Sequence, residues 1–178
     1  MTAAVWVALV AAGVALVQAT FSIVQKWKEL RWKQAELARE LINNWFDWEG
    51  SKIALSMVDE GEGDYTLAGY GTYHVNPEID IPQALGLTQD GPKTRPISNT
   101  PKDRLIRKCF DVLFFNFARV EQSIDIGVAK REDVIVPAEY YVAQLAVYKR
   151  VIVPYVEFSG FTNGLKFVRY FPSWHASI

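Results

Sequence analysis

TPKDRLIRKCFDVLFFNFARVEQSIDIG, residues 100–127, is the stretch that decides the fold of most of this 178-residue chain. Thr100, Pro101 and Asp103 stand where a helix prefers an N-cap, a first residue and an acid, and Gly127 predicts its end. Apolar side chains then recur every three or four residues: Ile106, Phe110, Leu113, Phe117, Val120 and Ile124. Cys109, Val112 and Phe114 widen this apolar stripe. We expect the helix to form the core of a domain.

Helical patterns flank this element on both sides. Residues 25–49 hold no Gly or Pro and many strong helix formers, and Gly50 predicts their end before a short helix at 52–58. Another helix is expected from Pro137 to about 158, kinked or restarted at Pro154, and a last one at 161–171.

Residues 61–100 are the least regular segment. A short extended piece is expected between residues 65 and 75, helical turns after Asn76 and Ile81, and a loop from Thr88 to Thr100. Because the remaining elements are helical with short turns, the predicted fold class is all-α. It consists of an N-terminal transmembrane helix that continues into a cytoplasmic helical bundle with one irregular segment.

The transmembrane prediction rests on residues 3–24, AAVWVALVAAGVALVQATFSIV, which include no charged residue. At ~1.5 Å per residue this helix is about 33 Å long, enough for a hydrocarbon core of about 30 Å. Two other interpretations are a signal peptide cleaved after Ala19 and a buried helix of a soluble protein. The first is disfavoured because apolar residues continue past Ala19, and the second because residues 3–17 lack a polar stripe. We therefore divide the chain into an anchor, residues 1–25, and a domain, residues 26–178.

Orientation follows from the basic residues that come after the apolar run. Lys26, Lys28, Arg31 and Lys33 predict a cytoplasmic domain and an external N-terminus. Membrane-interface anchoring is expected from these four residues and from Trp6, Trp27 and Trp32. A face for packing on another helix is expected at Ala8, Ala11, Ala12 and Ala15.

Composition narrows the function classes. The net charge of −1 argues against a nucleic-acid partner, and a single cysteine excludes an internal disulfide framework. The chain has six Trp, eight Tyr and ten Phe, which suit a well-filled core or a contact surface.

The second half resembles a group of uncharacterised bacterial single-pass membrane proteins with a small all-helical cytoplasmic domain of unknown function. The resemblance lies in FDVLFFNFARVEQSIDIGVAKREDV, EYYVAQLAVYKRVIVPYVE and FVRYF, and in ARELINNWFDWEGSKIALSMVD before them. The positions that match are Phe117, Glu121, Gly127, Glu132-Asp133-Val134 and Tyr140-Tyr141. The resemblance implies the helical fold, the inner membrane of a bacterium as the location, and no catalytic residue.

Chemical motifs are not found. His74 and His175 lack metal-binding neighbours, Cys109 lies on the apolar stripe, and the acidic loop 59–64 does not fit a calcium-binding pattern. Asp111 is expected to pair with Arg107 one turn earlier. An enzyme would need a pocket that brings together at least two of the four residues Asp111, Arg107, Tyr140 and His74. We expect no catalytic, cofactor-binding or metal-binding residue, no cofactor and no small-molecule substrate.

The predicted function is a non-catalytic accessory or scaffolding subunit. Its expected partners are the lipid bilayer and the other subunits of a larger membrane complex, for example a respiratory or photosynthetic assembly. The alternative is a membrane-tethered sensor or defence effector that acts through self-association of the anchor.

Overall fold

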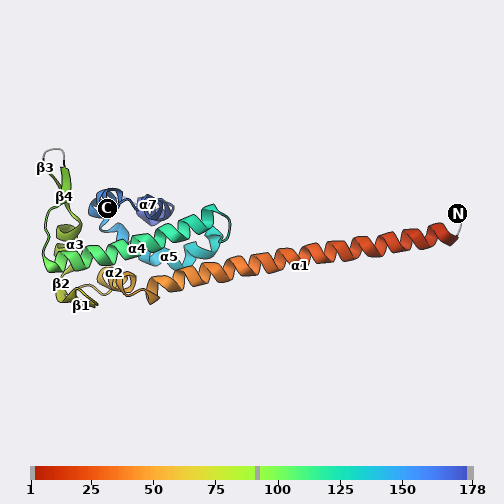
Figure 1. The fold of residues 1–178 in the computed structure, drawn as a ribbon, viewed down its shortest axis with the longest axis horizontal. Coiled ribbons are helices and arrows are strands. Elements are labelled where there is room, and N and C mark those ends of the chain that lie inside the picture. Colours follow the sequence, from red (N-terminus) through yellow and green to blue (C-terminus); the bar gives the residue numbers. More distant parts are fainter. Residues whose placement is uncertain (1–2, 91–92, 176–178) are drawn as a thin grey trace. The chain divides into compact units, whose positions relative to one another are not determined.

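The structure, a computed structural model, describes residues 3–90 and 93–175. About 75% of the chain is helical and 10% is strand, so the predicted helical class is confirmed at this level. The chain forms two compact units, Met1–Glu36 and Leu37–Ile178. Figure 1 labels the elements along the chain.

Helix α1 runs from Ala3 to Asp47 and supplies all the secondary structure of the first unit. Among the residues whose placement is described, no helix combines the length and apolar character needed to cross a membrane. The helix ends just before Trp48, whose extended backbone begins α2, Glu49–Asp59. The prediction that Gly50 ends the first helix was therefore wrong. Gly50 lies inside α2, where a Cβ atom would come within 3.1 Å of Val112.

Helix α4, Pro101–Asp125, is the centre of the second unit, as the sequence predicted. Its start is a capping box, because the Thr100 hydroxyl accepts from the Asp103 backbone while the Asp103 carboxylate accepts from the Thr100 backbone. Helices α2, α3 and α7 pack against it (Figure 1). Gly164 permits the closest approach: a Cβ there would lie 2.6 Å from the carbonyl oxygen of Phe114.

An aromatic cluster fills the space between the end of α1, α4 and α7. The ring of Trp45 meets those of Phe117 and Phe167 edge-on, at centroid distances of 5.0 and 5.8 Å. Phe114 and Phe171 extend the cluster at its two sides. All five side chains are buried, so the aromatic richness of the sequence is used in part to fill this core.

The C-terminal part is divided more finely than the sequence predicted. Its helices are α5 (Arg131–Ala146), α6 (Lys149–Phe158), α7 (Thr162–Arg169) and α8 (Pro172–His175). Pro137 lies inside α5 and Pro154 lies inside α6. The two helices are separated by Val147 and Tyr148. The start predicted at Pro137 was wrong, because α5 already begins at Arg131. The backbone of Lys130 is extended and forms the N-cap, and the acidic Glu132 and Asp133 occupy the first turn, where they are favourable.

The segment predicted as irregular contains two antiparallel hairpins and a helix. Strands β1 (Gly63–Leu67) and β2 (Gly71–Val75) form the first hairpin, and β3 (Leu87–Asp90) and β4 (Lys93–Pro96) form the second. Between them lies α3 (Pro77–Leu85), a single helix that continues through Pro82. The extended piece expected near residues 65–75 is confirmed. The loop expected from Thr88 to Thr100 is corrected to a hairpin followed by a short connection.

Candidate functional site

The first unit presents an apolar surface that this chain leaves uncovered. Every described residue from Val10 to Lys33 is exposed. Leu16, Val17 and Phe21 are 69%, 70% and 62% exposed, although side chains of this kind are normally buried. Apolar side chains exposed over this length indicate a surface that another apolar phase or partner covers.

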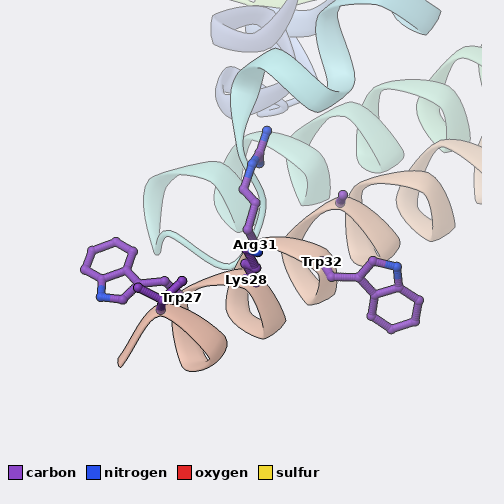
Figure 2. Close-up of a pocket in the computed structure, with 6 residues that line it drawn as sticks. Trp27, Lys28, Arg31 and Trp32 are labelled. Atoms are coloured by element: carbon purple, nitrogen blue, oxygen red, sulfur yellow. The ribbon is translucent and has the colours of Figure 1, made fainter. Parts of the chain in front are cut away.

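The predicted interface residues lie at the C-terminal side of this surface. Trp27 and Trp32 are exposed, and Figure 2 shows their indole rings extending from the helix in different directions, with Lys28 and Arg31 between them. Lys33 contacts Glu29 one turn earlier, with 2.7 Å between Nζ and Oε1. Trp6, near the other end of the apolar run, is 59% exposed. Indole rings thus stand near both ends, and the charged side chains at one end only.

Small residues interrupt the apolar surface of the first unit. Ala11, Ala12 and Ala15 are exposed, and Ala11 and Ala15 share one face because they are four residues apart. The side chain of Ala8 lies outside the described part of the structure.

Glu121, one of the positions on which the resemblance rests, has a buried carboxylate in the second unit. Glu121 is fully buried and accepts two hydrogen bonds from the Arg131 guanidinium, at 2.9 and 2.7 Å. Lys166 lies 3.0 Å from the same carboxylate and also contacts Asp125. The hydrogen bonds to Glu121 raise the pKa of Arg131, whose guanidinium also lies over the Tyr170 ring at 4.2 Å. These contacts join α4, α5 and α7, which is a structural role.

His74 is held between two carboxylates on the first hairpin. Its Nδ1 lies 2.8 Å from Asp64 and its Nε2 lies 2.9 Å from Glu62. Each nitrogen must carry a proton to donate to its own carboxylate, so the arrangement favours the imidazolium and raises the pKa of His74, chiefly through Glu62. The sequence did not reveal this cluster, because Asp64 and His74 become neighbours only through the pairing of β1 with β2.

The four residues considered for an enzyme site have separate partners. Tyr140 donates a short hydrogen bond to Asp59, whereas Tyr155 donates to Asp111 at 2.8 Å. Arg107 donates to the carbonyl oxygens of Ala84 and Ser98 and to the Asn99 side chain. The expected Arg107–Asp111 contact was therefore wrong, because these two described residues turn to different partners. Burial raises the pKa of Asp111.

Cys109 is fully buried, as predicted, and burial raises the pKa of its thiol to about 12. A thiol with that pKa is protonated near neutral pH and is a poor nucleophile. Within residues 3–90 and 93–175, no group of three or more His, Cys, Asp and Glu side chains is arranged to hold a metal ion.

Comparison of the chain with protein-family models, with curated proteins and with solved structures gives no match.

Replacing Arg131 with Ala should destabilise the second unit by about 3 kcal/mol, because Glu121 would keep only the half-exposed Lys166 as a cationic partner. Arg169→Ala is the matched control. Its partner Glu157 is exposed, so the expected loss is below about 1 kcal/mol. Urea unfolding of the full chain, followed by near-ultraviolet circular dichroism, measures both. Equal losses for the two variants would contradict a dominant role for the buried pair.

The His74 cluster should stabilise the first hairpin at low pH. Because the folded pKa is raised, this contribution is complete below the unfolded value of about 6.5 and is lost as the pH rises through the folded pKa. An NMR titration of the His74 ring should give a midpoint above that unfolded value. Glu62→Gln should lower the midpoint, whereas Glu78→Gln, at an exposed position on α3, should leave it in place. No response to Glu62→Gln would exclude the cluster in solution.

Proposed function

We propose that residues 3–24 anchor the protein in a membrane as a single span. The observation that supports this proposal is a run of 22 residues without a charge, whose described side chains are exposed from Val10 onward. A helix of this length and composition matches the thickness of a bilayer. Its apolar character extends around the helix, since the exposed Val14 and Leu16 are two residues apart and lie on nearly opposite sides.

The flanking side chains support one orientation for this anchor. Lys26, Lys28, Arg31 and Lys33 follow the apolar run, and no Lys or Arg precedes it. By the distribution of basic residues, the domain is cytoplasmic and the N-terminus is external. The resemblance to bacterial single-pass membrane proteins supports a bacterial inner membrane. Trp6, Trp27 and Trp32 hold the two interfaces, and each basic residue near anionic lipid contributes about 1 kcal/mol.

The domain is proposed to act without catalysis, as an accessory subunit that packs on a larger membrane complex. A surface cluster supports this role: Trp48 stacks on Phe115 at 5.9 Å, and the Arg119 guanidinium lies 5.5 Å from the Trp48 ring. Trp48 and Phe115 are 38% and 44% exposed. Tryptophan and arginine held in place by their neighbours are typical of the residues that dominate protein–protein interfaces. An energy-converting complex is one host of the proposed kind.

The anchor is tested by placing a charge in its centre. Leu16→Arg should reduce membrane insertion, because an arginine at the middle of a span costs about 2.5–3.5 kcal/mol. Gln34→Arg adds the same charge beyond the apolar run and should have no effect. The fraction of full-length protein that stays with membranes after carbonate extraction measures both. Complete release of the unaltered chain by carbonate would refute the anchor.

The accessory role is tested by mild detergent extraction from native membranes, followed by sizing and mass spectrometry. We expect stoichiometric migration with a large complex, and Trp48→Ala combined with Phe115→Ala should release the protein from it. Tyr70→Ala, which removes an exposed aromatic ring on the first hairpin, is the control and should leave migration unchanged. A small species of one chain type would refute the accessory role. If that species is an oligomer formed through the anchor, the sensor or effector alternative replaces it.

A further inference from the structure

The turn that joins α4 to α5 presents two apolar side chains to solvent. Ile126 and Val128, on either side of Gly127, are 68% and 41% exposed. Their backbone is fixed, because the N–H groups of Gly127 and Val128 donate to the carbonyl oxygens of Ile124 and Ser123, both at 3.0 Å, in the pattern of a Schellman motif. Gly127 has the positive φ of 76° that this motif requires. The two side chains are therefore held outward by a hydrogen-bonded turn.

Val128 lacks the apolar neighbour that usually accompanies this motif. A side chain at its position commonly packs on the last turn of the helix. Here the corresponding residues of α4 are the polar Gln122 and Ser123, and the Ser123 hydroxyl donates to the carbonyl oxygen of Arg119 at 2.9 Å. Ala129, the next residue along the chain, is buried and holds the turn against the core. The apolar side chain of Val128 therefore has no apolar cover from the helix that it ends.

An aromatic ring is exposed at the same end of the second unit. Tyr170 follows α7 and is 56% exposed. The guanidinium of Arg131, the first residue of α5 after the turn, lies over its ring at 4.2 Å and is held by the buried Glu121. Tyrosine combines an apolar ring with a polar hydroxyl, and such rings are enriched where a protein meets the membrane surface.

This end of the second unit is also the one at which the chain enters it. Trp45 of α1 meets Phe117 of α4 with ring centroids 5.0 Å apart. Figure 1 shows that this part of α1 and α4 run in opposite directions. Following α4 forward from Phe117 to Ile126 and α1 back from Trp45 to Leu37 covers similar lengths of helix and leads to the same end.

We propose that the α4–α5 turn and Tyr170 lie in the surface of the lipid bilayer, as a second membrane contact beside the anchor. This inference rests on the anchor proposed above. The chain between Lys33, the last of the basic residues, and Leu37 spans at most about 14 Å at any angle between the two units. A contact of few apolar side chains is sufficient here, because the anchor makes it intramolecular.

The charges at this end favour apolar insertion over attraction to an anionic surface. Arg131 and Lys166 both contact the buried Glu121, and Arg169 contacts Glu157 at 3.1 Å. Because these cationic side chains are paired with carboxylates, the contact should form on zwitterionic lipid as well as on anionic lipid.

The test measures which positions reach the bilayer, using the full-length protein reconstituted in phosphatidylcholine vesicles. An environment-sensitive fluorophore is attached to one introduced thiol at a time: Ile126→Cys at the turn, Leu16→Cys in the anchor, and Ile79→Cys as the matched control. Cys109 is buried and burial raises the pKa of its thiol to about 12, so the introduced thiol reacts in its place.

Ile79 is the matched control because it is an isoleucine of similar exposure, 63%, at the other end of the second unit. It lies on α3, and Arg107 near the start of α4 donates to Ala84 of α3 at 2.9 Å. Phosphatidylcholine with a nitroxide near the start of its acyl chains should quench the probes at positions 16 and 126 and leave the probe at position 79 unchanged. Adding phosphatidylglycerol should not alter this pattern.

The other outcomes separate a failure of this inference from a failure of the anchor. Quenching at position 16 without quenching at position 126 overturns the second contact, leaves the anchor in place, and makes a partner protein the occupant of the turn. Equal quenching at positions 126 and 79 also overturns it, because the domain would then have no preferred end. Quenching at position 126 only with phosphatidylglycerol overturns apolar insertion. No quenching at position 16 refutes the anchor and, with it, this inference.

A charge placed in the turn gives a second measurement. Val128→Asp should abolish quenching of the probe at position 126, because a carboxylate disfavours insertion of the turn. Ile97→Asp adds the same charge at a side chain that is 61% exposed near the start of α4, and should leave the quenching unchanged. Circular dichroism shows whether each variant is folded. Undiminished quenching in a folded Val128→Asp variant overturns the proposal.

Discussion

Edge-to-face contacts of Trp45 with Phe117 and Phe167 join three elements that are far apart in the sequence, namely the end of α1, the middle of α4 and α7. Rings in this arrangement add about 0.5–1.5 kcal/mol per pair to the effect of burying their area. Because α4 is apolar on more than one side, it needs neighbours on several faces at once. Helices α2, α3 and α7 meet that need, and the remaining helices and hairpins fill the spaces around them.

The two halves of α1 have opposite relations to this core. Ala38 and Trp45 are completely buried in the second unit, whereas the apolar residues of the first unit remain exposed. One helix thus provides part of a core and, in the function proposed here, a connection to the membrane. Trp48 ends that helix and begins the next, and its ring lies on the surface against Phe115. The proposed partner surface is therefore built where α1 passes into α2.

The sequence was informative where a pattern is local. Thr100, Pro101 and Asp103 lie within four residues, so the start of α4 and its apolar stripe could be predicted with correct bounds. The hairpins could not be found in this way, because the contact of His74 with Glu62 and Asp64 joins residues ten or more positions apart. Pro137 was also misleading: it is typical of a helix start, but α5 already begins at Arg131.

The two glycines that face α4 limit future variation of the chain in different ways. At Gly164 the obstacle to a side chain is the backbone carbonyl of Phe114, 2.6 Å from the position of a Cβ, and no substitution elsewhere removes a backbone atom. At Gly50 the obstacle is the side chain of Val112, at 3.1 Å, which a smaller residue at position 112 would remove. Position 164 is therefore fixed by the architecture itself. Positions 50 and 112 are free to change, provided that they change together.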